Sequence, residues 1–193
     1  LQQTKQLDAH WVLNDGIRFN LVQLDARFAD TTLMHFPFNK AIQNNTAITG
    51  NLGVAYNGEN GYRATAGLSS GFRSPNVDDL TKVFDTKTGY VVVPNKDLKP
   101  EYTYNAEINL SHTGNIASWG ASVFYTWFNN AIVVSKYNWN GQDNIMYQNV
   151  LSTVYAPQNQ ASAKLYGFNL NGKLKLFYNT LLQGTYTYTK GTY

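Results

Sequence analysis

The chain has no cysteine, few charged residues and no block of like charge. Because its cysteine count is 0, disulfides, zinc–thiolate sites and cysteine nucleophiles are excluded. Only 14% of the residues are charged, against about 25% in soluble globular domains, whereas 15% are aromatic. The net charge of +3 is spread along the chain, which argues against nucleic acid as a partner.

Long hydrophobic runs are also missing. The longest are Val91–Val93 and Ala131–Val134, far short of the ~20 apolar residues of a membrane-spanning helix. A helical membrane protein is therefore excluded, but a barrel is not, because barrel strands are apolar only at alternate positions. Asn, Gly, Ser and Thr fill much of the remaining sequence and are poor helix formers. We expect an all-β protein.

Alternation of apolar and polar residues is the clearest pattern in the chain. In one segment Tyr104 and Ile108 alternate with Glu107 and Asn109. The same pattern predicts eight strands, at residues 3–13, 17–29, 48–56, 62–73, 102–111, 117–128, 166–176 and 182–189. The second changes phase at Leu21-Val22, where we expect a β-bulge.

The predicted faces follow from this alternation alone. We expect the apolar face to meet lipid through Tyr104, Ile108, Trp119, Val123, Leu170 and Tyr186. We expect the polar face to point inward through Glu107, Asn109, Asn171 and Lys173.

The connections between the predicted strands alternate between short and long. Short turns rich in Gly and Asn are expected at Asn14-Asp15-Gly16, 57–61, 113–115 and 177–179. Long connections are expected at 30–45, 73–99 and 129–162. Outer-membrane barrels have short periplasmic turns and long extracellular loops, so the even-numbered strands should end outside the cell.

Strand length and aromatic positions fit a bilayer. A strand of about 12 residues, at ~3.3 Å per residue and tilted by ~45°, rises about 28 Å, close to the apolar thickness of an outer membrane. Aromatic residues gather near strand ends, as in interfacial girdles: Trp11, Tyr56, Tyr62, Phe72, Tyr102, Trp127, Phe177 and Tyr188. The alternative is a soluble β-sandwich, whose strands would usually be shorter and its connections more even.

Two motifs carry a resemblance to a known family. The segment 71–80 reads GFRSPNVDDL and the segment 93–101 reads VPNKDLKPE. In order and spacing they resemble the paired barrel boxes of TonB-dependent receptors, with Ser74 in place of Ala and Lys96 in place of Pro. The matching residues, to which the resemblance gives a structural role, are Phe72, Arg73, Pro75, Leu80, Asn95, Leu98, Pro100 and Glu101. Gly16-Ile17-Arg18 and the segment 159–170 are similar to two further strands of the family.

The resemblance implies a fold and a function. Residues 1–193 would form part of an antiparallel up-and-down transmembrane β-barrel, about eight strands of a 22-stranded barrel. No resemblance to the plug domain, the TonB box or the final strands is present, so we expect an internal piece of the barrel. The family imports scarce metal chelates such as siderophores, haem or cobalamin across the outer membrane of Gram-negative bacteria. Outer-membrane lipid, the chelate, and TonB acting through the N-terminal region would be its partners, with no cofactor.

Nothing in the sequence supports catalysis. A catalytic triad order, a paired carboxylate site, a phosphate-binding loop and a dinucleotide fingerprint are all missing. We therefore do not expect an enzyme, although a catalytic outer-membrane barrel stays open as an alternative. A complete small barrel with a structural or adhesive role is a second one.

Candidate ligand-binding residues lie in the predicted external loops. His10, His35 and His112 lack the spacing of a metal site, but His35 falls in such a loop. In haem importers of the family a histidine commonly lies between the two boxes, whereas this chain has Asp78, Asp79, Lys82, Asp85, Lys87 and Tyr90 there. This absence disfavours haem.

Two further groups of loop residues have either a structural or a ligand-binding role. Arg73, Asp78 and Asp79 at one foot of loop 73–99, with Glu101 at the other, either anchor the loop or contact ligand. Between the feet, Asn76 and the acidic residues after it predict a helical turn over residues 76–83. In loop 129–162, Tyr137, Trp139, Tyr147 and Tyr155 either capture a planar chelate or pack on one another.

Overall fold

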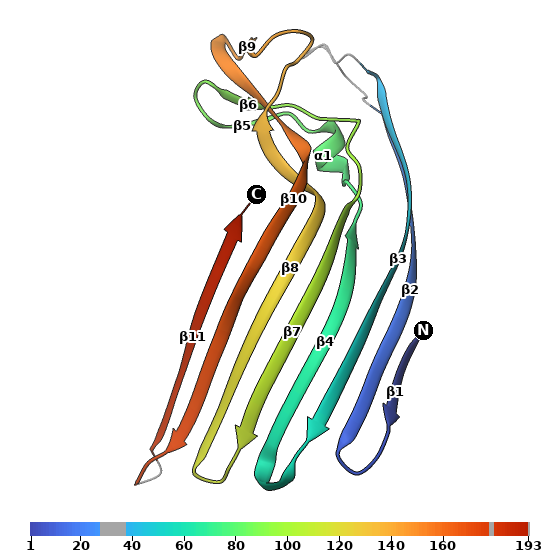
Figure 1. Ribbon diagram of the computed structural model, residues 1–193. Helices are drawn as coiled ribbons and strands as arrows, with labels where there is room; N and C mark the ends of the chain where they lie inside the picture. Colours follow the sequence, from blue (N-terminus) through green and yellow to red (C-terminus); the bar gives the residue numbers. More distant parts are fainter. Residues whose placement is uncertain (28–37, 178–179, 193) are drawn as a thin grey trace.

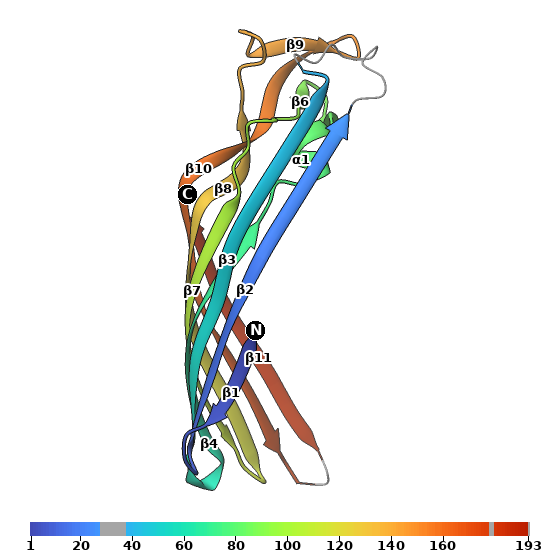
Figure 2. The ribbon, with the colours of Figure 1, turned by 90° about the vertical axis from the view of Figure 1, so that its right-hand side faces the viewer.

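The computed structural model describes residues 1–27, 38–177 and 180–192 and consists almost entirely of one curved sheet (Figures 1 and 2). Its strands are β1 (Gln2–Gln6), β2 (Trp11–Arg27), β3 (Lys40–Asn57), β4 (Tyr62–Arg73), β5 (Phe84–Lys87), β6 (Tyr90–Val92), β7 (Glu101–Thr113), β8 (Ala117–Lys136), β9 (Asn144–Tyr147), β10 (Val150–Lys175) and β11 (Leu181–Thr192). Its helices are α1 (Val77–Thr81) and the 3₁₀ turn η1 (Glu59–Gly61). No helix in these described ranges is long and apolar enough to cross a membrane.

Eight of the strands form the wall, in agreement with the predicted number. They pair antiparallel in the order β1-β2-β3-β4-β7-β8-β10-β11. The remaining three, β5, β6 and β9, belong to the loops at the upper end of the wall (Figure 1). Most wall strands are long, from 12 residues in β4 to 26 in β10. The up-and-down barrel wall expected from the alternation is therefore confirmed.

The predicted turn at Asn14-Asp15-Gly16 is wrong. These residues lie inside β2, and the chain turns at Leu7–His10 instead. There the Asp8 Oδ1 atom accepts hydrogen bonds from the N–H groups of His10 and Trp11, each at 2.8 Å. These bonds hold the pKa of Asp8 below its usual value. Gly16 leaves room for the Asn51 side chain across the strand pair, which would have to shift if a Cβ were present there.

The expected β-bulge at Leu21-Val22 is also wrong. β2 and β3 keep one register from Trp11↔Tyr56 to Arg27↔Lys40. Beyond Leu21-Val22 the inner face of β2 becomes apolar and its outer face becomes polar, because the inner face is covered there by other residues. Beyond this point the inner residue Leu24 packs against the buried cluster of Ala41, Leu80 and Leu98, while the outer residues Gln23, Asp25 and Arg27 are exposed.

Two of the predicted long connections are shorter in the structure. β3 already begins at Lys40, and β8 and β10 remain paired up to Lys136↔Tyr155. The connection predicted at 129–162 therefore narrows to residues 137–149, which include β9. In the upper parts of these paired strands apolar and polar residues no longer alternate regularly, so the sequence there resembles a loop. The connection at 73–99 lies where the sequence predicts it.

The two faces of the wall have the predicted character. All six predicted lipid-facing side chains are exposed, Ile108 at 59% and Tyr186 at 60% among them. On the inner face, facing residues join in polar pairs: Asn109 donates to Thr65 at 3.0 Å and Thr126 donates to Asn105 at 2.8 Å. The wall is thus apolar outside and amide- and hydroxyl-rich inside.

Candidate functional site

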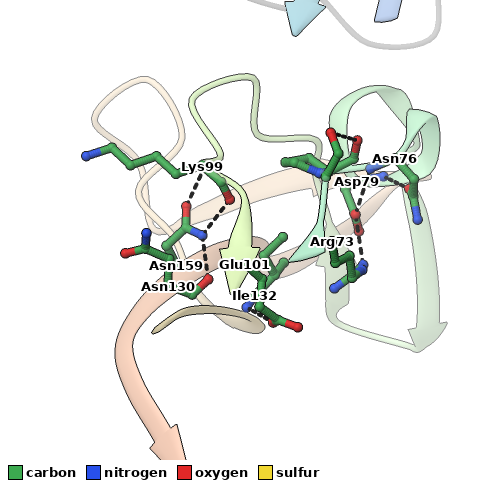
Figure 3. A network of polar contacts seen from close by, with 10 residues as sticks. Arg73, Asn76, Asp79, Lys99, Glu101, Asn130, Ile132 and Asn159 are labelled. Carbon is green, nitrogen blue, oxygen red and sulfur yellow. Dashed lines mark hydrogen bonds and ion pairs between the residues drawn. The ribbon is translucent and has the colours of Figure 1, made fainter. Parts of the chain in front are cut away.

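The candidate site is the loop cluster at the upper end of the wall, and it begins at the first foot of loop 73–99 (Figure 3). The Asn76 side chain accepts from the Asp79 N–H at 2.8 Å, and the Asp79 carboxylate accepts from the Asn76 N–H at 3.1 Å. This capping box begins α1, so the predicted helical turn is confirmed. The same carboxylate accepts from Arg73 at 3.0 Å. Asp78 instead pairs with Lys82 at 3.6 Å on the exposed side of α1.

The second foot of the loop is fixed by backbone bonds (Figure 3). Glu101, the cross-strand partner of Arg73, accepts from the Ile132 N–H at 2.8 Å. Asn159 accepts from the Lys99 N–H at 2.7 Å, and its amide donates to Lys99 O at 2.9 Å and to Asn130 O at 2.8 Å. Both feet are therefore anchored to the wall, which agrees with the structural interpretation of Arg73 and Glu101.

Between its feet the loop folds onto the concave side of the wall. The inner-face residue Gln43 donates to Lys96 O and Leu98 O at 3.2 and 3.1 Å. Asn95 donates to Pro157 O at 2.9 Å. Leu98 and Leu80 are buried against Ala41, with Leu24 and Ile132 beside them. The segment 95–99 thus crosses the inside of the sheet from β3 to β10.

Replacing Asn159 with alanine should loosen this loop. The change removes three hydrogen bonds to backbone groups, at a cost of about 0.5–1.5 kcal/mol for each bond in local stability. We expect limited proteolysis to cleave loop 73–99 faster in Asn159→Ala than in the parent protein. Asn169→Ala, which removes one inner-face bond to Ser122, is the control. Equal protection of the loop in both variants would contradict this role.

The tip of the loop forms a hairpin that extends the sheet. β6 pairs parallel with β10, and β5 pairs with β6. The rings of Tyr90 and Tyr155 stack with centroids 4.1 Å apart. Lys87 Nζ lies 5.5 Å from the centroid of the Tyr90 ring. Burial of Tyr90, followed by the influence of Tyr155, raises the pKa of the Tyr90 phenol.

The predicted aromatic residues of the next loop pack on one another. Trp139 is only 6% exposed and belongs to a buried cluster with Val91, Val93, Val154 and Ala156. Tyr137 and Tyr147 pack against this cluster. These three side chains hold the two loops together, in agreement with the self-packing interpretation of this loop.

The histidines lie apart from the loop cluster where they are described. His35 falls outside the described residues. His10 Nδ1 lies 2.8 Å from Asn57 O near the short turns, and His112 lies 4.4 Å from Tyr62 between ring centroids. Within the described ranges, no three His, Asp or Glu side chains gather as a metal site would require.

The structure therefore separates the predicted site residues. Arg73 and Asp79 are joined in the anchor, and Asp78 and Lys82 lie on exposed α1. Tyr90 and Tyr155, each named from a different predicted loop, form the stacked surface at the loop tip. Lys136 and Asn159 are not among the site residues that the sequence predicts. Lys136 reaches the site because β8 pairs with β10, and Asn159 reaches it because its side chain bonds to loop 73–99.

Known proteins share this fold and sequence pattern. The closely superimposable structures include the copper transporter OprC, with a TM-score of 0.73, 19% identity, and coverage of 98% of this chain and 27% of that one. The siderophore receptor PirA from Pseudomonas aeruginosa gives a TM-score of 0.66 at 15% identity, covering 97% of this chain and 30% of that one. At these identities the likeness concerns the fold.

A curated relative is more similar in sequence. The hemoglobin and hemoglobin-haptoglobin-binding protein A of Haemophilus influenzae is 30% identical over 145 residues, which cover 68% of this chain and 13% of the relative. The chain thus spans a small part of the proteins it matches. The profile of the family described as TonB dependent receptor-like, beta-barrel, matches residues 1–193. The chain belongs to the TonB-dependent receptor β-barrel family.

Proposed function

We propose that this chain forms wall strands and extracellular loops of an outer-membrane receptor that imports a metal chelate, with energy supplied through TonB. The observation that carries the proposal is loop 73–99, which is anchored at both feet and folded onto the concave, polar side of the wall. A structural or adhesive barrel has no need of a built loop on the inside of its wall. A receptor needs one where ligand enters.

The two faces of the wall support the rest of the proposal. The exposed apolar outer face suits outer-membrane lipid, and the inner face of paired amides and hydroxyls suits a lumen too wide to be filled by the wall's own side chains. The names of the similar proteins speak of copper, a siderophore and hemoglobin, and this common link to metals supports a metal or its chelate as the ligand class. None of these names describes an enzyme.

Labelling of single cysteines in the full-length receptor tests the orientation on which the proposal depends. Thr88 lies between β5 and β6, and Asn115 lies in the short turn between β7 and β8. We expect a membrane-impermeant maleimide to label Thr88→Cys on intact cells and to label Asn115→Cys only after the outer membrane is permeabilised. The chain itself has no cysteine to interfere. Labelling of Asn115→Cys alone on intact cells would invert the orientation and remove the basis of the proposal.

A further inference from the structure

The stacked tyrosines at the loop tip lie on the lumen side of β10. Tyr155 is separated by even numbers of residues from Asn159 and Asn169, and the pairing of β10 with β8 keeps one register along this stretch. Asn169 donates to Ser122 on the inner face, and Asn159 holds the segment that crosses that face. Because side chains alternate along a strand, Tyr155 points to the same side as both asparagines.

Two lysines border the stacked pair. Lys136 is the cross-strand partner of Tyr155, so their Cβ atoms lie about 4.5–5.5 Å apart on one face. Lys87 is the cross-strand partner of Tyr90, with its Nζ 5.5 Å from the ring centroid. Both lysines are exposed, and no ion pair involves either in the part of the chain that the structure describes. Their charges are available to a ligand.

The same face continues as an apolar surface toward the hairpin of β9 and β10. Leu151 lies four residues before Tyr155 on β10, and Met146 is its cross-strand partner. Each of these two side chains is 65% exposed. Exposed large apolar side chains outside the membrane, next to half-buried aromatic rings, are typical of a binding surface.

From this arrangement we infer that the face of Lys87, Tyr90, Tyr155 and Lys136 binds the chelate through a planar aromatic group that carries negative charge. The rings and the apolar side chains contact the aromatic plane, and the lysines pair with its anionic substituents. Catecholate siderophores and carboxylate-bearing tetrapyrroles share this chemistry. The inference deepens the proposed function, on which it rests.

The tyrosines act through their rings and not as phenolate ligands to the metal. Within the described ranges no group of three His, Asp or Glu side chains is present that could hold a metal beside them, and burial raises the pKa of Tyr90, which favours its neutral form. The two rings are also stacked face to face, with centroids 4.1 Å apart, so that the pair offers its outer ring surface and ring edges to a ligand. Removal of the Tyr90 hydroxyl should therefore matter little, and removal of its ring should matter much.

Equilibrium binding to the purified full-length receptor tests the inference, with a ferric tris-catecholate, haemin and a neutral ferric hydroxamate as probes. We expect the receptor to bind at least one of the two aromatic anions more tightly than the hydroxamate. Lys87→Ala and Lys136→Ala should each raise the Kd for that probe by about tenfold. Tyr90→Ala should raise it by about five- to tenfold and Tyr90→Phe by less than twofold.

Lys96→Ala is the matched control, because Lys96 is an exposed lysine of the same loop that pairs only with its neighbour Asp97 among the ion pairs described. Whichever aromatic probe responds to the lysine variants identifies the source of the group. Preference for the hydroxamate, an unchanged Kd in the double variant of Lys87 and Lys136, or a large effect of Tyr90→Phe would overturn the inference.

Uptake measured in parallel separates this inference from the proposed function. A receptor that takes up its chelate with unaltered affinity in the lysine variants keeps the transport function and loses the inferred contact. A receptor that binds an aromatic anion as described but does not carry it across the outer membrane keeps the contact and loses the transport function.

Discussion

Replacing residues 80–94 with two glycines should reduce chelate uptake by the full-length receptor to the level of a receptor-deficient strain. The replacement removes β5, β6 and the Tyr90 ring, and with them most of the surface that loop 73–99 presents to the lumen. The chain can be rejoined there because the Asn95 N–H donates to Asp79 O at 3.2 Å, so the two cut ends already lie in contact. Uptake of a radiolabelled chelate by whole cells is the measurement.

The wall should survive this change. The ion pair of Arg73 and Asp79, the bonds from Gln43 and Asn95, and the pairing of Arg73 with Glu101 all lie outside the replaced segment. The variant should therefore reach the outer membrane in normal amount, which fractionation and surface labelling verify. Uptake at the full rate would show that the loop only connects β4 to β7. Loss of the protein from the membrane would show that it is needed for folding.

The wall could be predicted from the sequence because the polarity of each wall residue depends only on the face on which it lies and not on contacts with distant segments. Ile108 lies on the exposed apolar outer face and Asn109 on the polar inner face, so the chain alternates wherever the wall separates two such surroundings. The same logic explains the error at Leu21-Val22. Where β2 reaches the covering loop, its inner face becomes apolar and its outer face polar although the strand has no bulge. A bulge would produce the same change of phase in the sequence.

Local hydrogen bonds decided which turns could be predicted. The α1 turn depends on Asn76 and Asp79, three residues apart, and the sequence alone predicts it. Asn14-Asp15-Gly16 has the composition of a turn, yet the chain turns where the carboxylate of Asp8 can accept from two backbone N–H groups. Composition favours a turn at residues 14–16. The turn forms at Leu7–His10 instead, where Asp8 accepts the two hydrogen bonds and the pairing of β1 with β2 sets the register.

The loop cluster could not be assembled from sequence because its contacts join distant segments. The short apolar run Val91–Val93 pairs beside β10 and fills a cluster with Trp139 and Val154. This pairing also brings Tyr90 to Tyr155 and leaves Lys136 beside them. The sequence identified Tyr90 and the aromatic loop as candidates, but which aromatic residues face the lumen and which are buried depends on the register of β6 on β10.

Arginine at position 108 should impair insertion of the receptor, whereas arginine at the adjacent position 109 should be tolerated. Ile108 lies near the middle of β7, is 59% exposed on the apolar face and is flanked across the strands by Ala66 and Val123. A guanidinium there would lie in hydrocarbon, at a cost of about 2–4 kcal/mol near the bilayer midplane. Asn109→Arg replaces a lumen-facing amide and loses one hydrogen bond to Thr65, at about 1 kcal/mol.

Folding of the full-length receptor into lipid vesicles, followed by denaturant unfolding, measures this difference. We expect Ile108→Arg to lower the free energy of unfolding by at least 1 kcal/mol more than Asn109→Arg, in line with the two costs. Ile108→Leu, which keeps the face apolar, should behave as the parent protein. Equal losses at 108 and 109 would mean that the alternation of β7 does not separate lipid from lumen. The inner face that carries Asn159 and Tyr155 would then lose its assignment as well, because its orientation follows from the same register through β8 to β10.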